Sequence, residues 1–77
     1  MIDLLKFLIS KITGSEDFTV TETTDERGEV FEVKADPAII GLIIGKEGKT
    51  IKNIRRIASI KGVFDKKSVN IKVIEKD

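Results

Sequence analysis

Nine consecutive residues decide how this chain of 77 residues is interpreted: Ile43-Ile44-Gly45-Lys46-Glu47-Gly48-Lys49-Thr50-Ile51. Gly45 and Gly48 stand between two apolar segments that have helical spacing. Glycine leaves room for close backbone approach, and the free amides at the start of the second helix attract phosphate. The stretch therefore indicates contact with a phosphate-bearing strand rather than catalysis, although two glycines at this spacing also fit a simple helix corner.

A helix is expected on each side of this turn. The first, about residues 37–44, begins at Asp36-Pro37, where Asp caps the helix and Pro takes its first position. Within it, Gly41 costs about 1 kcal/mol relative to Ala, which leaves open a role in close packing or backbone approach. The second helix, about residues 49–61, can end at Gly62. Its apolar stripe consists of Ile51, Ile54, Ile57 and Ala58.

The rest of the chain predicts one more helix and three strands. Apolar residues at three- and four-residue steps predict a helix at about 2–12. Alternating apolar and polar residues predict strands at about 17–24, 29–35 and 68–75, and a polar turn joins the first two into a hairpin. The length fits one α+β domain over residues 1–77, in the order helix, strand, strand, helix, helix, strand.

The hairpin turn is rich in acidic residues. Asp25, Glu26 and Glu29 offer the oxygen ligands that a hard cation such as Mg²⁺ or Ca²⁺ prefers. Their spacing does not follow an ordered ligand pattern such as the EF-hand loop. The sequence therefore favours a solvated turn over a metal site.

The composition excludes several kinds of chemistry. The chain contains no Cys and no His, so it lacks thiolates, disulfides and the commonest nitrogen ligand and acid-base group. The apolar start is interrupted by Asp3 and Lys6, which argues against an export signal or a membrane span. We therefore expect a cytoplasmic protein that is not an enzyme and needs no cofactor, metal or small-molecule substrate.

Charge is distributed unevenly along the chain. Residues 1–36 contain four Lys or Arg and nine Asp or Glu, a net charge of −5, whereas residues 37–77 contain ten against four, a net charge of +6. The helical period places Lys49, Lys52 and Arg56 within about 60° of one another, with Arg55 on the far side of Lys52. This basic face predicts attraction to phosphates, or else is a solvated helix surface.

With its flanks, the turn resembles the hallmark of the KH family, Ile-Ile-Gly-x-x-Gly-x-x-Ile. The element order is similar to the type II KH arrangement, and this resemblance implies a three-stranded mixed sheet packed against three helices. Nearly the whole chain resembles the small stand-alone bacterial KH RNA-binding proteins of the KhpA (YlqC) type, on residues 35–37, 41–48, 54–55, 67 and 69–71. Leu42 departs from that pattern, because the family often has a basic residue there.

The resemblance also implies a binding site. In KH domains the Gly-x-x-Gly loop holds the backbone of about four nucleotides of single-stranded RNA. Ile40, Ile44 and Ile51 are candidates for an aliphatic floor under the bases, or else belong to the core. Glu47 opposes phosphate locally but is tolerated as long as Lys46 remains. The implied RNA-binding residues are Ile44, Gly45, Lys46, Glu47, Gly48, Lys49, Ile51, Lys52, Arg55 and Arg56.

Two functions fit this resemblance. The first is a single-stranded RNA-binding module that acts as a post-transcriptional regulator or RNA chaperone. The second is a protein-interaction module, either a homodimer or a heterodimer with a larger RNA-binding protein, since doubling a short site raises avidity. Phe7 and Ile60, apolar residues off the main stripes of their helices, are the candidate contacts.

Overall fold

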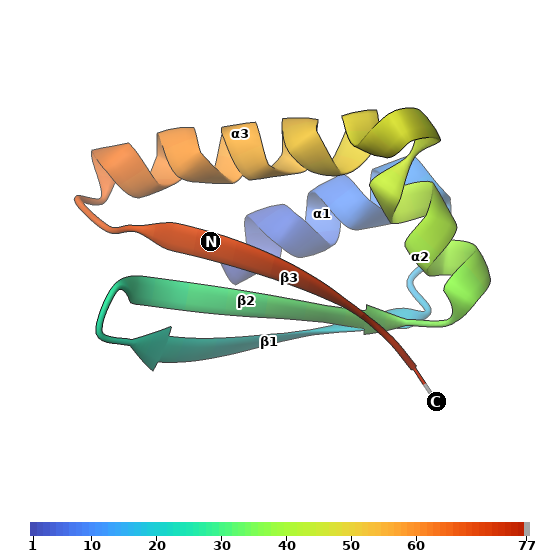
Figure 1. Ribbon diagram of the computed structural model, residues 1–77, viewed down its shortest axis with the longest axis horizontal. Coiled ribbons are helices and arrows are strands. Elements are labelled where there is room, and N and C mark those ends of the chain that lie inside the picture. Colours follow the sequence, from blue (N-terminus) through green and yellow to red (C-terminus); the bar gives the residue numbers. More distant parts are fainter. Residues whose placement is uncertain (77) are drawn as a thin grey trace.

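The computed structural model describes residues 1–76 and has two layers, with the helices on one side of a sheet (Figure 1). The predicted order of elements is confirmed, and it is that of the type II KH fold. In chain order the elements are α1 (Ile2–Thr13), β1 (Phe18–Asp25), β2 (Gly28–Ala35), α2 (Pro37–Ile44), the 3-10 turn η1 (Lys46–Gly48), α3 (Lys49–Phe64) and β3 (Val69–Glu75).

The sheet is mixed, as expected. Its strands lie in the order β1-β2-β3, with β1 antiparallel and β3 parallel to the central strand β2. The parallel pairing requires a crossover, and α2 and α3 supply it. Consequently the turn between these two helices lies at one end of the helical layer, and β3 is an edge strand that runs beside α3 (Figure 1).

The core lies between the helices and one face of the sheet. Phe31, Val33 and Ala35 alternate along β2 and are all buried, because successive side chains of a strand point to opposite faces. The other strands contribute Val20 and Ile71 to this cluster. From the helices it receives Leu5, Ile9, Ile40, Ile43, Ile51, Ile54 and Ala58.

The end of α3 differs from the prediction. The helix does not stop at Gly62 but continues to Phe64, and Ile57, expected in the buried stripe, is exposed. Gly62 is buried instead, and a Cβ there would lie 2.7 Å from the Lys67 carbonyl oxygen and 2.8 Å from Val69 Cγ2. Glycine is needed here because the chain returns closely against the helix as it enters β3.

The other helix and strand boundaries agree closely with those predicted from the sequence. The span of α2 is the one predicted. α1, β2 and β3 differ from their predicted ranges by one residue at one end, and β1 is shifted by one residue at both ends, differences within the uncertainty of helix and strand ends. Among residues 1–76, no helix combines the length and hydropathy that crossing a bilayer requires.

The two glycines inside helices should respond in opposite ways to alanine. Gly41 is exposed, and no heavy atom outside its own helix lies within 4 Å of a Cβ built there. We expect Gly41→Ala to raise the free energy of unfolding by about 0.5–1 kcal/mol. Gly62→Ala should lower it by about 1–3 kcal/mol through overpacking. Urea unfolding monitored by circular dichroism measures the free energy of unfolding of each variant. Equal changes in the two variants would contradict the opposite roles of these glycines.

Candidate nucleic-acid interface

The turn between α2 and α3 depends on two glycines with positive φ. Gly45 has φ 75° and ψ 176°, and its amide donates a hydrogen bond to the Gly41 carbonyl at 2.9 Å. Gly48 has φ 74° and ψ 14° and stands at the N-cap of α3. Its amide donates to the Gly45 carbonyl at 3.1 Å. Together these bonds hold a tight turn whose backbone most L-residues could not adopt.

The inner side of this turn is closely packed and its outer side is open. A Cβ on Gly45 would overlap the hydroxyl and Cβ of Thr50 in the first turn of α3. At Gly48, by contrast, nothing lies within 4 Å of the corresponding position. The backbone at Gly48 can therefore be approached closely from outside the molecule.

Glu47 also adopts a left-handed conformation, which the sequence did not indicate. Its φ is 58°, and this conformation costs roughly 1–2 kcal/mol for a residue with a Cβ. Its carboxylate lies 4.0 Å from Lys49 Nζ, and both side chains are largely exposed. A surface pair of this kind contributes little to stability, so Lys49 remains available to another anion.

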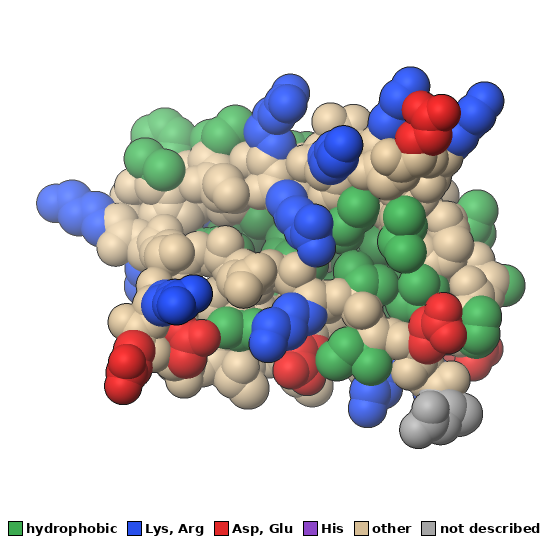
Figure 2. Space-filling view, viewed as in Figure 1, with side chains coloured by type: hydrophobic (Ala, Val, Ile, Leu, Met, Phe, Trp, Pro, Cys, Tyr) green, Lys and Arg blue, Asp and Glu red, His purple; other side chains and the backbone are tan. Residues whose placement is uncertain are grey.

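The basic residues predicted for the site lie along α3 and its preceding turn. Lys46, Lys49, Lys52 and Arg56 are all exposed, and Figure 2 shows Lys and Arg side chains along this edge of the molecule. Arg55 lies differently from the rest, because its Nη2 donates a hydrogen bond to the Ile71 carbonyl of β3 at 3.4 Å. It therefore connects α3 to the edge strand, a contact that helical periodicity alone cannot predict.

The three isoleucines proposed as a floor are separated by the structure. Ile40 and Ile51 are 4% and 7% exposed and belong to the core, so they support the turn from below. Ile44 is 39% exposed and lies directly before the turn. Figure 2 shows apolar side chains in a hollow between α3 and β3, so an apolar surface is present between these two elements.

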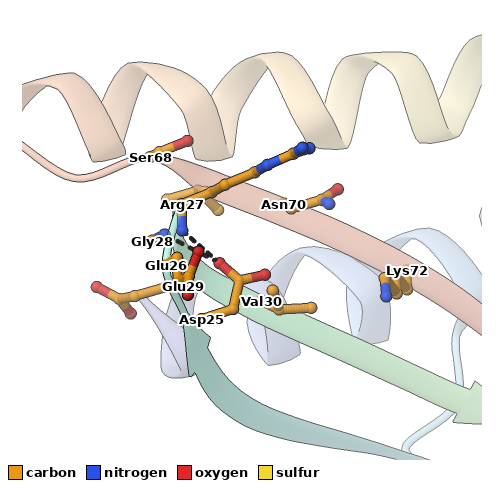
Figure 3. A pocket seen from close by; sticks show the side chains of 10 residues that line it. Asp25, Glu26, Arg27, Gly28, Glu29, Val30, Ser68, Asn70 and Lys72 are labelled. Atoms are coloured by element: carbon orange, nitrogen blue, oxygen red, sulfur yellow. Dashed lines mark hydrogen bonds between the residues drawn. The ribbon is translucent and has the colours of Figure 1, made fainter.

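A second hollow, not predicted from the sequence, lies at the hairpin end of the sheet (Figure 3). Its volume is about 600 Å³, and it is open to solvent. Val30, buried but outside the main core, lies in its lining. The polar side chains that the lining offers to a ligand are Arg27, Ser68, Asn70 and Lys72.

Two of the acidic residues of this turn, Asp25 and Glu29, bond within the protein. Asp25 Oδ1 accepts hydrogen bonds from the amides of Arg27 and Gly28, at 2.8 and 3.1 Å. Glu29 Oε1 lies 3.0 Å from Lys67 Nζ. The two bonds to Asp25 make this a hydrogen-bonded turn. Within residues 1–76, no group of three His, Cys, Asp or Glu side chains could hold a metal ion.

Glu22 and Glu29 shift each other's acidity. A hydrogen bond between the two carboxyl groups raises the pKa of Glu22, with a smaller contribution from desolvation. The same bond lowers the pKa of Glu29, and the hydrogen bond from Lys67 lowers it further. Glu29 is therefore the member of the pair that stays ionised at the lower pH.

Several apolar side chains are exposed on the helices. Phe7 and Ile60, singled out from the sequence, are 57% and 54% exposed. The structure adds Val63 and Phe64 in the extra turn of α3, and Phe64 is 81% exposed. The sequence did not single out these two residues, because the predicted helix ended at Gly62.

An exposed Gly-x-x-Gly turn between two helices, within an α-β-β-α-α-β fold, defines a type II KH domain. Comparison with known protein families supports this class, because the family model described as KhpA/KhpB, KH domain, matches residues 2–73. The chain belongs to this family.

Two relatives cover nearly the whole chain. The RNA-binding protein KhpA of Thermotoga maritima is 32% identical over 71 residues, 92% of this chain and 93% of the relative. The protein of the same name in Aquifex aeolicus is 30% identical over 74 residues, 95% of this chain and 94% of the relative.

A third relative is much longer than this chain. The polyribonucleotide nucleotidyltransferase of Trichormus variabilis is 32% identical over 71 residues, which are 91% of this chain but 10% of that enzyme. The similarity therefore concerns one small part of it. No solved structure matches this chain significantly.

Proposed function

We propose that this protein is a non-enzymatic module that binds single-stranded RNA in the cytoplasm of a bacterium. The two relatives that match over nearly their full length are named RNA-binding proteins, and a KH turn holds about four nucleotides. Its biological role is that of a post-transcriptional regulator or RNA chaperone.

The observation that carries this proposal is the asymmetry of the turn. Thr50 fills the space on the inner side at Gly45, whereas the space above Gly48 is empty. The amides of Gly48 and Lys49 already donate within the turn, so a phosphate at this position is attracted by the positive end of the α3 helix dipole. Lys46 and Lys49 flank it with exposed ammonium groups, which supply attraction without base selectivity.

In this proposal the bases of the bound segment lie against Ile44 and reach Arg55, whose guanidinium is bonded to the Ile71 carbonyl of β3. KH domains hydrogen-bond splayed bases in a groove, and Arg55 carries donors that its bond to Ile71 does not use. Ile51 supports this surface from the core rather than contacting RNA. Catalysis is not part of the proposal, because the chain has no His or Cys.

A pair of isosteric variants tests the turn. Gly48→Asn and Gly48→Asp both tolerate the left-handed backbone, and the open space accepts either side chain. They differ by one negative charge at the phosphate position. We expect Gly48→Asp to bind RNA at least about tenfold more weakly than Gly48→Asn, equivalent to about 1.4 kcal/mol, with similar melting temperatures.

Fluorescence anisotropy with a labelled, unstructured RNA decanucleotide measures this difference. Wild-type protein that binds RNA while both variants bind it equally well would show that the phosphate does not lie at Gly48. Wild-type protein without measurable RNA affinity would contradict the proposed function as a whole.

A second function is favoured by the apolar stripe of α3, formed by Ile57, Ile60, Val63 and Phe64. Residues spaced in this way lie on one side of a helix. A group of exposed apolar side chains on one side of a helix forms a patch, and such a patch indicates an interaction site. We propose that a second copy of the chain covers this stripe, which raises RNA affinity through avidity.

Ile60→Glu should therefore convert a dimer to a monomer, because the charge would be buried in the interface. Thr21→Glu is the control, since it adds the same charge at an exposed position of β1 whose side chain points away from the core. Sedimentation equilibrium measures the mass of each variant. A wild-type protein that is monomeric at high micromolar concentration would contradict this second function.

A further inference from the structure

We propose that the single-stranded RNA track extends beyond the Gly-x-x-Gly turn to the hairpin hollow. There Arg27, Asn70 and Lys72 hold one additional nucleotide. This inference rests on the proposed RNA binding and adds a second, separate subsite to it. Its occupant is a nucleotide of a strand that the turn already anchors.

The first step of the argument is the position of Arg55. Its hydrogen bond to the Ile71 carbonyl places a guanidinium at the middle of β3, between the turn and the hairpin end of the sheet. Lys72 follows directly along the same strand and is exposed. Positive groups therefore continue from α3 onto the edge strand, and Figure 2 shows Lys and Arg side chains over both elements on this face.

The hollow itself has the size and the groups for a nucleotide. It measures about 600 Å³, and Val30 supplies an apolar surface within it. Asn70 presents both donors and an acceptor to a base edge, and it lies next to Lys72 on β3. In Figure 3 the Arg27 side chain extends from the hairpin turn across the start of β3 toward Asn70. Phosphate contact by Arg27 and Lys72 would leave the base facing Asn70.

The charges around the hollow explain why a nucleotide binds there only as part of a strand that is anchored at the turn. Within residues 1–76, neither Arg27 nor Lys72 forms an ion pair. The carboxylates of Asp25 and Glu29 are bonded within the protein, yet with Glu26 they leave the lining net negative. A free anion would not accumulate here. A nucleotide on a strand that is already held at the turn arrives at high effective concentration.

The distance along α3 sets the length of RNA required. The helix has 16 residues and is therefore about 24 Å long. At the stacked spacing of about 3.4 Å per nucleotide, about seven nucleotides span the helix, and fewer do so if the strand is extended. A tetranucleotide can occupy the turn alone, whereas a decanucleotide can reach both subsites.

The test compares these two RNAs with wild-type protein and with the double variant Arg27→Ala, Lys72→Ala. We expect wild-type protein to bind the decanucleotide more tightly than the tetranucleotide. The variant should bind the tetranucleotide as wild type does and the decanucleotide about tenfold more weakly. Its salt dependence on the longer RNA should be less steep by about 1.4, for two phosphate contacts to a single strand.

Lys6→Ala with Lys11→Ala is the control, because it removes the same charge from exposed positions on α1. The extended track would be overturned if the double variant lost affinity equally for both RNAs, or if the control lost as much affinity for the decanucleotide. Either result would show only a general electrostatic effect. Equal wild-type affinity for the two RNAs would overturn the extended track as well. Failure of wild-type protein to bind either RNA would instead contradict the proposed function itself.

Discussion

The close contact between Gly45 and Thr50 is the constraint on which the rest of the site depends. Because no side chain fits between them, α2 and α3 meet at a turn in which the backbone itself forms the surface. This packing sets the direction of α3 and of its basic face. It also leaves the outer side of Gly48 open, so the closed and open sides of the turn are consequences of one arrangement.

The isoleucines around this turn have two different tasks. Ile40 and Ile51 are buried in the core between the helices and the sheet, where removing a large side chain costs about 2–5 kcal/mol. Ile44 is partly exposed beside the loop. The same apolar motif thus stabilises the fold and supplies a surface, which is why the stretch from Ile43 to Ile51 carries both structural and functional information.

Much of the fold could be predicted from the sequence, because its signals are local. Periodicity, the Asp36-Pro37 helix start and the glycine turn gave the order and most boundaries of the elements. The predicted end of α3 was wrong. A glycine in this position usually signals a helix end, but here Gly62 is required because the chain returns closely against the helix at Lys67 and Val69. That requirement is tertiary and leaves no local signal.

That the residues of the turn bind RNA stays a prediction. The structure shows that residues 44–49 lie together between the two helices, whereas Ile51 lies in the core. The bond of Arg55 to Ile71 joins residues 16 positions apart, and the hairpin hollow combines a turn with a strand about forty residues further along the chain. Such contacts depend on how α3 packs beside β3 and how β3 lies beside the hairpin, and these tertiary arrangements leave no local signal in the sequence.

The central claim is that the backbone of the turn contacts RNA. A titration of ¹⁵N-labelled protein with an unstructured RNA tetranucleotide, followed by amide chemical shifts, tests it most directly. The account predicts the largest changes at residues 44–49, with little change along β1. Changes confined to β1 or α1, with the amides of Gly45 and Gly48 unaffected, would contradict it.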